Sequence, residues 1–272
     1  MAPSILLPLQ ELDTAVETLR YAGVRVHVFD DTGTATPDSV FPNNWFSTHS
    51  GGHIAIYPMH APNRRLERRW DVIEALKRSY RVQDVIDFSG LEEDGLALEG
   101  TGAMVLDHIG RIAYTVTSNR ADPVLLERFC THFNYEPMAF EARDAAGREV
   151  YHSNVLMGIG TDFAMICLSM ISDPDRRREI ATRLAETGHE VIDLTEDQIQ
   201  NFAGNVFALT GSKPLLALST RALTALRPDQ IRIIERSTSL LPLSIPTIET
   251  AGGSVRCMLA GIHLSPRERT TT

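Results

Sequence analysis

The sequence has 272 residues, of which 43% are hydrophobic and 22% are charged, a composition typical of a globular protein with ample material for a core. Its formal net charge of -9 argues against a nucleic-acid or acidic-membrane partner, because binding of phosphate groups draws on clustered Lys and Arg. No apolar stretch approaches the roughly 20 residues that span a bilayer, the first residues lack a secretory signal, and three cysteines do not make a disulfide framework. We therefore expect a cytoplasmic protein with one domain over residues 1–272.

Hydrophobic periodicity predicts that helices and strands alternate along the chain. In the first half we expect a helix at 10–22, strands at 24–29 and 53–58, a charged amphipathic helix at 64–80, strands at 81–87, 103–107 and 111–116, a helix at 121–133 and a strand at 135–140. In the second half we expect strands at 154–159 and 163–169, a helix at 174–187, strands at 190–194, 205–210 and 214–218, a helix at 220–226, a helix or strand near 230–236 and a strand at 255–263.

Two stretches, 10–58 and 174–218, repeat the order helix, strand, polar loop and strand pair. A repeated β-β-α-β unit predicts modules arranged around a centre rather than a doubly wound sheet. Nucleotide binding has no support, because neither a glycine-rich fingerprint after a strand nor a Gly-Lys-Ser/Thr motif is present.

Cys257, in the segment 252–258 (GGSVRCM), is the candidate nucleophile of the chain. Glycines before it allow close backbone approach, and Arg256 is adjacent, whereas Cys130 and Cys167 lie in apolar patterns typical of packed thiols. From these residues alone, an inert thiol at the start of a strand is the commoner alternative for Cys257 as well.

A carboxylate and an imidazole complete the set that covalent thiol catalysis needs. Glu99 stands in 98–102 (LEGTG) and His152 in 151–154 (YHSN). Each has a plain alternative, since Glu99 alone would cap the next strand and His152 alone would be a satisfied core histidine.

Two polar clusters admit both structural and binding interpretations. The segment 41–46 (FPNNWF) has the composition of a turn, and the arginines of 64–69 (RRLERR) suit a solvated helix face or a grip on a carboxylate. His49, His53 and His60 match no helical pair of metal ligands and have no Cys or carboxylate beside them, so no metal site is expected.

In combination these motifs resemble the amidinotransferase or pentein superfamily, and within it the citrulline-utilisation hydrolase group. The likeness runs from about residue 10 to about residue 264 and rests on motifs that recur in the family's order. They are 41–49 (FPNNWFSTH), 57–59 (YPM), 61–69 (APNRRLERR), 98–102 (LEGTG), 246–249 (PTIE) and 256–258 (RCM).

The resemblance implies a five-bladed α/β propeller with pseudo-fivefold symmetry and an active site on its axis. It implies Cys257 as nucleophile, His152 as general acid and base, and Glu99 as the carboxylate that binds the guanidine or urea group. The same resemblance implies that four further residues contact the substrate: Asp38, Asn44, Arg64 and Arg120, of which the two arginines would hold the α-carboxylate. Neither a metal nor an organic cofactor is implied, and the partner is a small amino-acid substrate.

Two departures from the family pattern refine this expectation. Asn44 stands where deiminases and dimethylarginine hydrolases carry an aspartate, and a neutral amide suits a neutral urea better than a guanidinium, which favours citrulline. The chain also starts almost at the helix 10–22, without the strand and lid loop that precede it in the family, so an incomplete first blade is expected. The expected products are ornithine, ammonia and carbon dioxide.

Three other functions stay open at this stage. The first is a hydrolase or deiminase of arginine or methylarginine, and the second is an amidinotransferase with an amine in place of water. The third is a binding scaffold disabled by the short N-terminus, although the joint presence of Asp38, Glu99, His152 and Cys257 argues against it. The oligomeric state also stays open, with a homodimer as one option.

Overall fold

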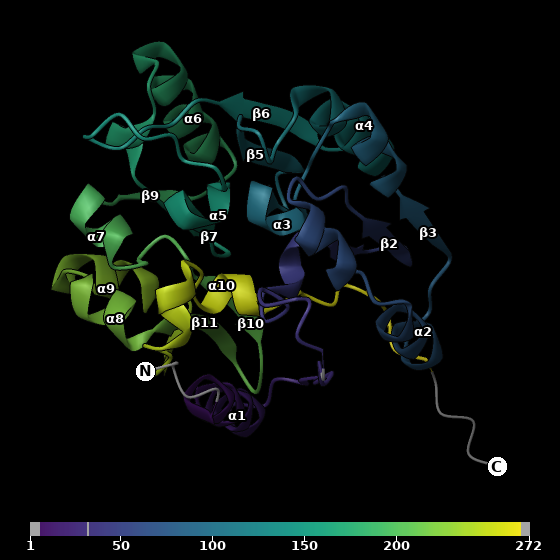
Figure 1. The fold of residues 1–272 in the computed structure, drawn as a ribbon. Helices are drawn as coiled ribbons and strands as arrows, with labels where there is room; N and C mark the ends of the chain where they lie inside the picture. The colour runs from purple at the N-terminus through teal and green to yellow at the C-terminus, as the bar shows by residue number, and fades with distance from the viewer. Residues whose placement is uncertain (1–5, 32, 268–272) are drawn as a thin grey trace.

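The computed structural model describes residues 6–31 and 33–267, in which four similar modules surround a centre (Figure 1). Each module pairs two antiparallel strands and then adds a third strand parallel to the second, after a helix that crosses over. The sheets are β1 (Phe46–His49), β2 (His53–Ile56) and β3 (Asp84–Asp87); β4 (Met104–Asp107), β5 (Ile112–Val116) and β6 (Glu136–Phe140); β7 (Met157–Ile159), β8 (Phe163–Ile166) and β9 (Glu190–Asp193); and β10 (Phe207–Thr210), β11 (Pro214–Ser219) and β12 (Ser239–Leu243).

The longer helices lie outside the sheets, at the periphery of the molecule (Figure 1). The crossover helices are α2 (Trp70–Ser79), α4 (Pro123–Phe133), α6 (Pro174–Glu186) and the pair α8 (Thr220–Ala225) and α9 (Pro228–Ile234), while α1 (Leu6–Tyr21) packs near β12. The start of α4 shows why these helices form where they do. The Asp122 carboxylate accepts from the Val124 N–H, Pro123 occupies the first turn, and Asn134 ends the helix with φ of 55°.

Short helices gather at the centre instead (Figure 1). They are η1 (Pro42–Asn44), α3 (Gly100–Ala103), α5 (Ser153–Leu156) and α10 (Val255–Met258). The helices α3 and α5 are followed directly by the first strand of a module, and one residue separates η1 from β1. The helix η1 packs against α3 and α10, and α3 packs against α5. The remaining short helices are η2 (Pro62–Glu67), η3 (Ser89–Asp94), η4 (Leu168–Met170), α7 (Glu196–Gln200) and η5 (Ile248–Ala251).

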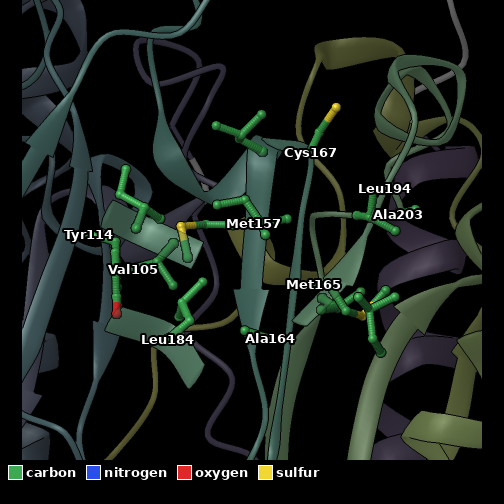
Figure 2. Close-up of a cluster of buried hydrophobic side chains, with 14 of the residues drawn as sticks. Val105, Tyr114, Met157, Ala164, Met165, Cys167, Leu184, Leu194 and Ala203 are labelled. Carbon is green, nitrogen blue, oxygen red and sulfur yellow. The ribbon is translucent and has the colours of Figure 1, made fainter. Parts of the chain in front are cut away.

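The largest hydrophobic cluster joins the second, third and fourth modules (Figure 2). Tyr114 from β5, Met165 from β8 and Leu184 from α6 are all fully or almost fully buried in it. Full burial of a large side chain of this kind contributes about 1.5–3 kcal/mol, so this shared cluster holds neighbouring modules together and fixes the centre between them.

The repeated β-β-α-β unit predicted from the sequence is confirmed by these modules, and the predicted helices at 10–22, 121–133 and 174–187 are present. The five-bladed propeller stays a prediction, because residues 6–31 and 33–267 form four three-stranded sheets. No helix within that part of the chain is long and apolar enough to cross a membrane.

Four predicted elements are wrong in type or extent. Residues 24–29 form no strand, and 255–263 begins with α10, because the Cys257 and Met258 N–H groups donate to the Ser254 carbonyl. The predicted strand at 154–159 likewise begins inside α5, in an apolar run whose periodicity does not separate helix from strand. The predicted helix at 64–80 is broken between η2 and α2, where Arg68 and Arg69 have extended backbones.

Candidate active site

A cavity of about 190 Å³ lies at the short helices in the centre of the molecule. Six of the seven residues expected in the site line it, namely Asp38, Asn44, Arg64, Arg120, His152 and Cys257. The seventh, Glu99, is fully buried beside His152. Residues from widely separated parts of the chain therefore meet, as the sequence-based hypothesis requires. We call this space the catalytic cavity.

Glu99 and His152 occupy equivalent positions in neighbouring modules, each immediately before a short central helix. Their side chains meet with 2.7 Å between His152 Nε2 and Glu99 Oε2. The hydrogen belongs to Nε2, because an ionised carboxylate only accepts. This assignment leaves His152 Nδ1 as the nitrogen that can take up a proton.

Buried charges around Glu99 determine its ionisation. Burial alone would raise the pKa of Glu99, but the hydrogen bond from His152 and the charges of His152, Arg120 and Arg64 outweigh it and lower the pKa to about 2. The Arg120 and Arg64 Nη1 atoms lie 3.6 and 4.0 Å from Glu99 Oε2. Burial lowers the pKa of His152, an effect that Glu99 opposes in part. At neutral pH the pair is thus a carboxylate and a neutral imidazole.

Two glycines of α3 let this carboxylate approach the centre. Gly100 has φ of +46°, and a Cβ there would lie 2.6 Å from the Asn43 carbonyl oxygen. A Cβ on Gly102 would lie 2.2 Å from Asn44 Oδ1 and 3.2 Å from His152 Cε1. The segment 98–102 therefore needs glycine at both positions to pack against η1 and His152.

Cys257 is 6% exposed and sits in α10 with two amide donors on its sulfur. Asn154 Nδ2 lies 3.2 Å and Asn205 Nδ2 3.3 Å from Cys257 Sγ. The Asn205 amide is itself fixed, because Nδ2 also donates to the Asn154 carbonyl and Oδ1 accepts from the Arg256 N–H. Donors aimed at sulfur stabilise a thiolate more than a thiol.

The two arginines of the cavity differ in how much of the guanidinium is free. Arg64 is 5% exposed, and both its Nε and Nη2 donate to Glu67 over 2.8 Å, with Asp38 Oδ2 at 4.0 Å from Nε. The Arg120 guanidinium instead lies over the Tyr151 ring, 4.6 Å from its centroid, and remains partly exposed. Arg120 therefore has the more accessible donors.

Sequence reasoning singled out none of four residues that complete this geometry: Asn154, Asn205, Glu67 and Tyr151. Two of them carried a local signal, since Asn154 follows His152 by two residues and Glu67 follows Arg64 by three. Within the described residues no group of three His, Cys, Asp or Glu is arranged to hold a metal ion. Cys130 and Cys167 are buried and free, as expected for packed thiols.

Comparison with known proteins decides the family. The model for N,N dimethylarginine dimethylhydrolase of the eukaryotic type matches residues 6–264. The chain belongs to this family. It is accordingly a member of the amidinotransferase or pentein superfamily and a hydrolase of carbon–nitrogen bonds other than peptide bonds, which confirms both expectations. No curated protein matches the chain.

Several solved structures share the fold of this chain. The N-terminal domain of ArgZ, an arginine dihydrolase of the cyanobacterial ornithine–ammonia cycle, in a mutant form bound to substrate, has a TM-score of 0.72 at 14% identity, covering 94% of this chain and 88% of that one. A dimethylarginine dimethylaminohydrolase adduct has a TM-score of 0.68 at 13% identity, covering 94% and 91%. This chain spans 39% of the longer ArgZ chain, at a TM-score of 0.74 and 16% identity.

Proposed function

We propose that this member of the family is a cysteine-dependent hydrolase of a free amino acid that carries a ureido or guanidino group, with citrulline as the preferred substrate. The observation that carries the proposal is the sulfur of Cys257, which receives two amide donors and lies at the cavity that His152, hydrogen-bonded to the buried Glu99, also lines. A nucleophile, a proton carrier and its orienting carboxylate are thereby present in one small space.

In the proposed reaction the Cys257 thiol gives its proton to His152, and the sulfur attacks the ureido carbon. The carbon–nitrogen bond breaks, and the departing nitrogen takes the proton from the imidazolium. Neutral His152 then accepts a proton from water, whose oxygen attacks the carbonyl carbon of the thiocarbamate. The carbon–sulfur bond breaks, and the Cys257 sulfur recovers the proton from the imidazolium. For citrulline, the carbamate released in this step splits at its remaining carbon–nitrogen bond, so that one water in total yields ornithine, ammonia and carbon dioxide. The buried Glu99 carboxylate stabilises the imidazolium in both steps.

Binding of the amino-acid backbone is assigned to Arg120 rather than shared equally with Arg64. The fork of Arg64 is already occupied by Glu67, while Arg120 is held by its ring contact with Tyr151 and keeps accessible donors. A bidentate contact to a carboxylate requires two free N–H groups on one side of the guanidinium. Arg64 then serves mainly to balance the charges of Glu67, Asp38 and Glu99.

Asn44 supports citrulline over arginine. Its amide is 3% exposed and lies against Gly102 and next to the His152 ring, where it can both donate to and accept from a neutral urea. Arginine is the second candidate, favoured by the half-exposed Asp38 carboxylate in the same cavity and by the fold shared with an arginine dihydrolase. A cationic guanidinium would pair with Asp38 and Glu99.

The test is a product assay with citrulline, arginine, dimethylarginine and N-acylated arginine offered separately at equal concentration. Ornithine and ammonia from citrulline are expected, with much slower release of citrulline or ornithine from arginine. Mass spectrometry after an acid quench should find the acyl adduct on Cys257 and none on Cys130. Faster turnover of arginine would replace the preferred substrate, and absence of turnover together with no labelling of Cys257 by a haloacetamidine would favour a binding scaffold.

Three further expectations belong to this proposal. The five-bladed arrangement is supported by residues 259–263, which follow α10 in the order in which first strands follow the other central helices. A cytoplasmic location is supported by three free, buried cysteines. A homodimer remains the option for the assembly.

A further inference from the structure

A second cavity, of about 100 Å³, lies along the inner strands and is separate from the catalytic cavity. Its lining comes mainly from β1, β4, β7 and β10, together with Thr101 of α3, Arg256 of α10, and Gly261 and His263 of the segment 259–263. We call it the axial cavity. The helix α10 serves both spaces, because Cys257 lines the catalytic cavity and Arg256 the axial one. Successive residues of a helix point about 100° apart, so neighbours can face different spaces.

The axial cavity has cationic and imidazole groups but no acid. Its ionisable lining residues are Arg256, His49, His108 and His263, and no Asp or Glu lines it within the described part of the chain. Its hydroxyl groups are already used as donors or shared. Thr48 Oγ1 donates to the Gly261 carbonyl, Thr101 Oγ1 donates to the Asn43 carbonyl, and Ser47 Oγ bonds to His49 and Tyr57. The donors left for a ligand are therefore nitrogen atoms.

Arg256 is held in place with no carboxylate partner among the described residues. Its guanidinium lies over the Phe207 ring, 4.1 Å from the centroid, and Nη1 donates to the Leu259 carbonyl. It forms no ion pair within residues 6–31 and 33–267. Burial lowers the pKa of Arg256 to about 10, and the charge that opposes this effect is that of Cys257. A cation positioned by stacking, with Nε and Nη2 not engaged by any described residue, is ready to bind an anion.

Three imidazoles line the cavity together with this cation. His108 and His263 stand at the mouth of the cavity with their ring centroids 4.3 Å apart, and His108 Nδ1 lies 2.9 Å from the Tyr135 hydroxyl. His49 is 4% exposed, and its Nδ1 has no hydrogen-bond partner in the described structure. Burial, followed by the charges of His108 and His263, lowers the pKa of His49 to about 3. At neutral pH these imidazoles are therefore neutral, and Arg256 carries the positive charge of the axial cavity.

We propose that the axial cavity is a binding site for a small oxyanion of the size of phosphate or bicarbonate. Arg256 supplies charge and N–H donors, and the imidazoles of His108 and His263 close the mouth. The volume of about 100 Å³ admits such an ion with water and excludes a nucleotide. Bicarbonate is relevant because the proposed hydrolysis of citrulline releases carbon dioxide, although the site itself does not depend on that reaction.

The test is isothermal titration of the whole chain with inorganic phosphate and, in a second arm, with bicarbonate at constant ionic strength. We compare the wild type with Arg256→Met, which keeps an unbranched apolar side chain but removes the guanidinium, and with Arg120→Gln, which removes the accessible arginine of the catalytic cavity. Saturable binding is expected in the wild type, with a Kd about tenfold or more higher in R256M and within about twofold in R120Q. The anion bound more tightly identifies the ligand, and either result supports the site.

A second variant guards against a fold defect in R256M. His263→Gln changes an exposed residue at the mouth and should raise the Kd about threefold while circular dichroism stays that of the wild type. Binding lost in R120Q but retained in R256M would place the anion in the catalytic cavity and overturn the proposal. No saturable binding of either anion by the wild type would overturn it as well.

Discussion

The catalytic and axial cavities use the same kinds of cationic side chain in opposite electrostatic settings. In the catalytic cavity Arg64 is paired with Glu67, and both Arg120 and His152 face Glu99. In the axial cavity Arg256 has no acid near it among the described residues. Cationic side chains paired with buried carboxylates keep their positions while a reaction proceeds. An unpaired cation, in contrast, is stabilised most when it binds an anion. The presence of arginine and histidine therefore does not define a site until their counter-charges are known.

The substitution Cys257→Ala should distinguish the functions of the two cavities most clearly. This change should lower turnover about ten thousandfold, because no other described thiol lines the catalytic cavity. Substrate binding by calorimetry should stay within a few-fold, since the arginines and carboxylates remain. Phosphate binding in the axial cavity should also persist. Turnover above a tenth of wild type would exclude Cys257 as nucleophile.

Glu99→Gln makes the catalytic cavity resemble the axial one. The amide keeps the shape but removes the charge that orients His152 and balances Arg120, so turnover should fall about a thousandfold. A new, weak phosphate site should appear in calorimetry, and it should vanish in the double variant with Arg120→Gln. An E99Q enzyme with wild-type turnover and no added anion binding would contradict the electrostatic contrast. Glu92→Gln, which alters a partly buried carboxylate outside both cavities, is the matched control.

Acid should weaken the fold through the same carboxylate. A pKa of about 2 in the fold against a usual 4.5 means that ionised Glu99 contributes stability above pH 4.5, which is lost as the pH falls toward 2. The size of this contribution is of the order of 3 kcal/mol. The lowered pKa of His152 acts in the same direction below its usual value of 6.5. Urea unfolding at pH 7 and pH 3 should show a larger loss for the wild type than for E99Q.

The smallest effect is expected from Asn154→Ala, which removes one of the two donors to the Cys257 sulfur. Alkylation of Cys257 by iodoacetamide at pH 7 should slow by about tenfold, because the thiolate loses a hydrogen bond of about 1.5 kcal/mol. Asn201→Ala, at a surface amide that contacts Arg221, should leave the rate unchanged. Equal rates in both variants would show that Asn154 does not act on the sulfur.

The sequence predicted the modules well and the central elements poorly. Helices such as α6 carry a clear apolar stripe, which ends in the buried Ile180 and Leu184, and they were predicted within a residue. Strand β1 was missed because 41–46 resembles a turn and all four strand residues are buried, which removes the alternation. Segments of the centre, such as α10, are four residues long, and tertiary contacts rather than periodicity decide their form.

The candidate site could be assembled from the sequence only by resemblance. Nothing local relates Cys257 to Asn154 or Asn205, which are 103 and 52 positions away in the chain. The pairing of Arg64 with Glu67 was within reach, because residues three apart in a helical turn are neighbours. The lack of an ion pair at Arg256 could not be predicted from the sequence, because it depends on the absence of a carboxylate from all the described segments that line the axial cavity.

The arrangement of the central helices also determines how the protein loses activity on heating. Glu99 precedes α3, His152 precedes α5, and Cys257 belongs to α10, so two modules and the segment after the fourth module each supply one of the three proposed catalytic groups. Local opening of any one of these three parts separates the groups while the other sheets stay paired. On gentle heating, turnover should therefore disappear at a lower temperature than the circular dichroism of the helices. The temperature at which turnover is lost therefore reflects the least stable of these contacts, whereas circular dichroism reflects the average helix content.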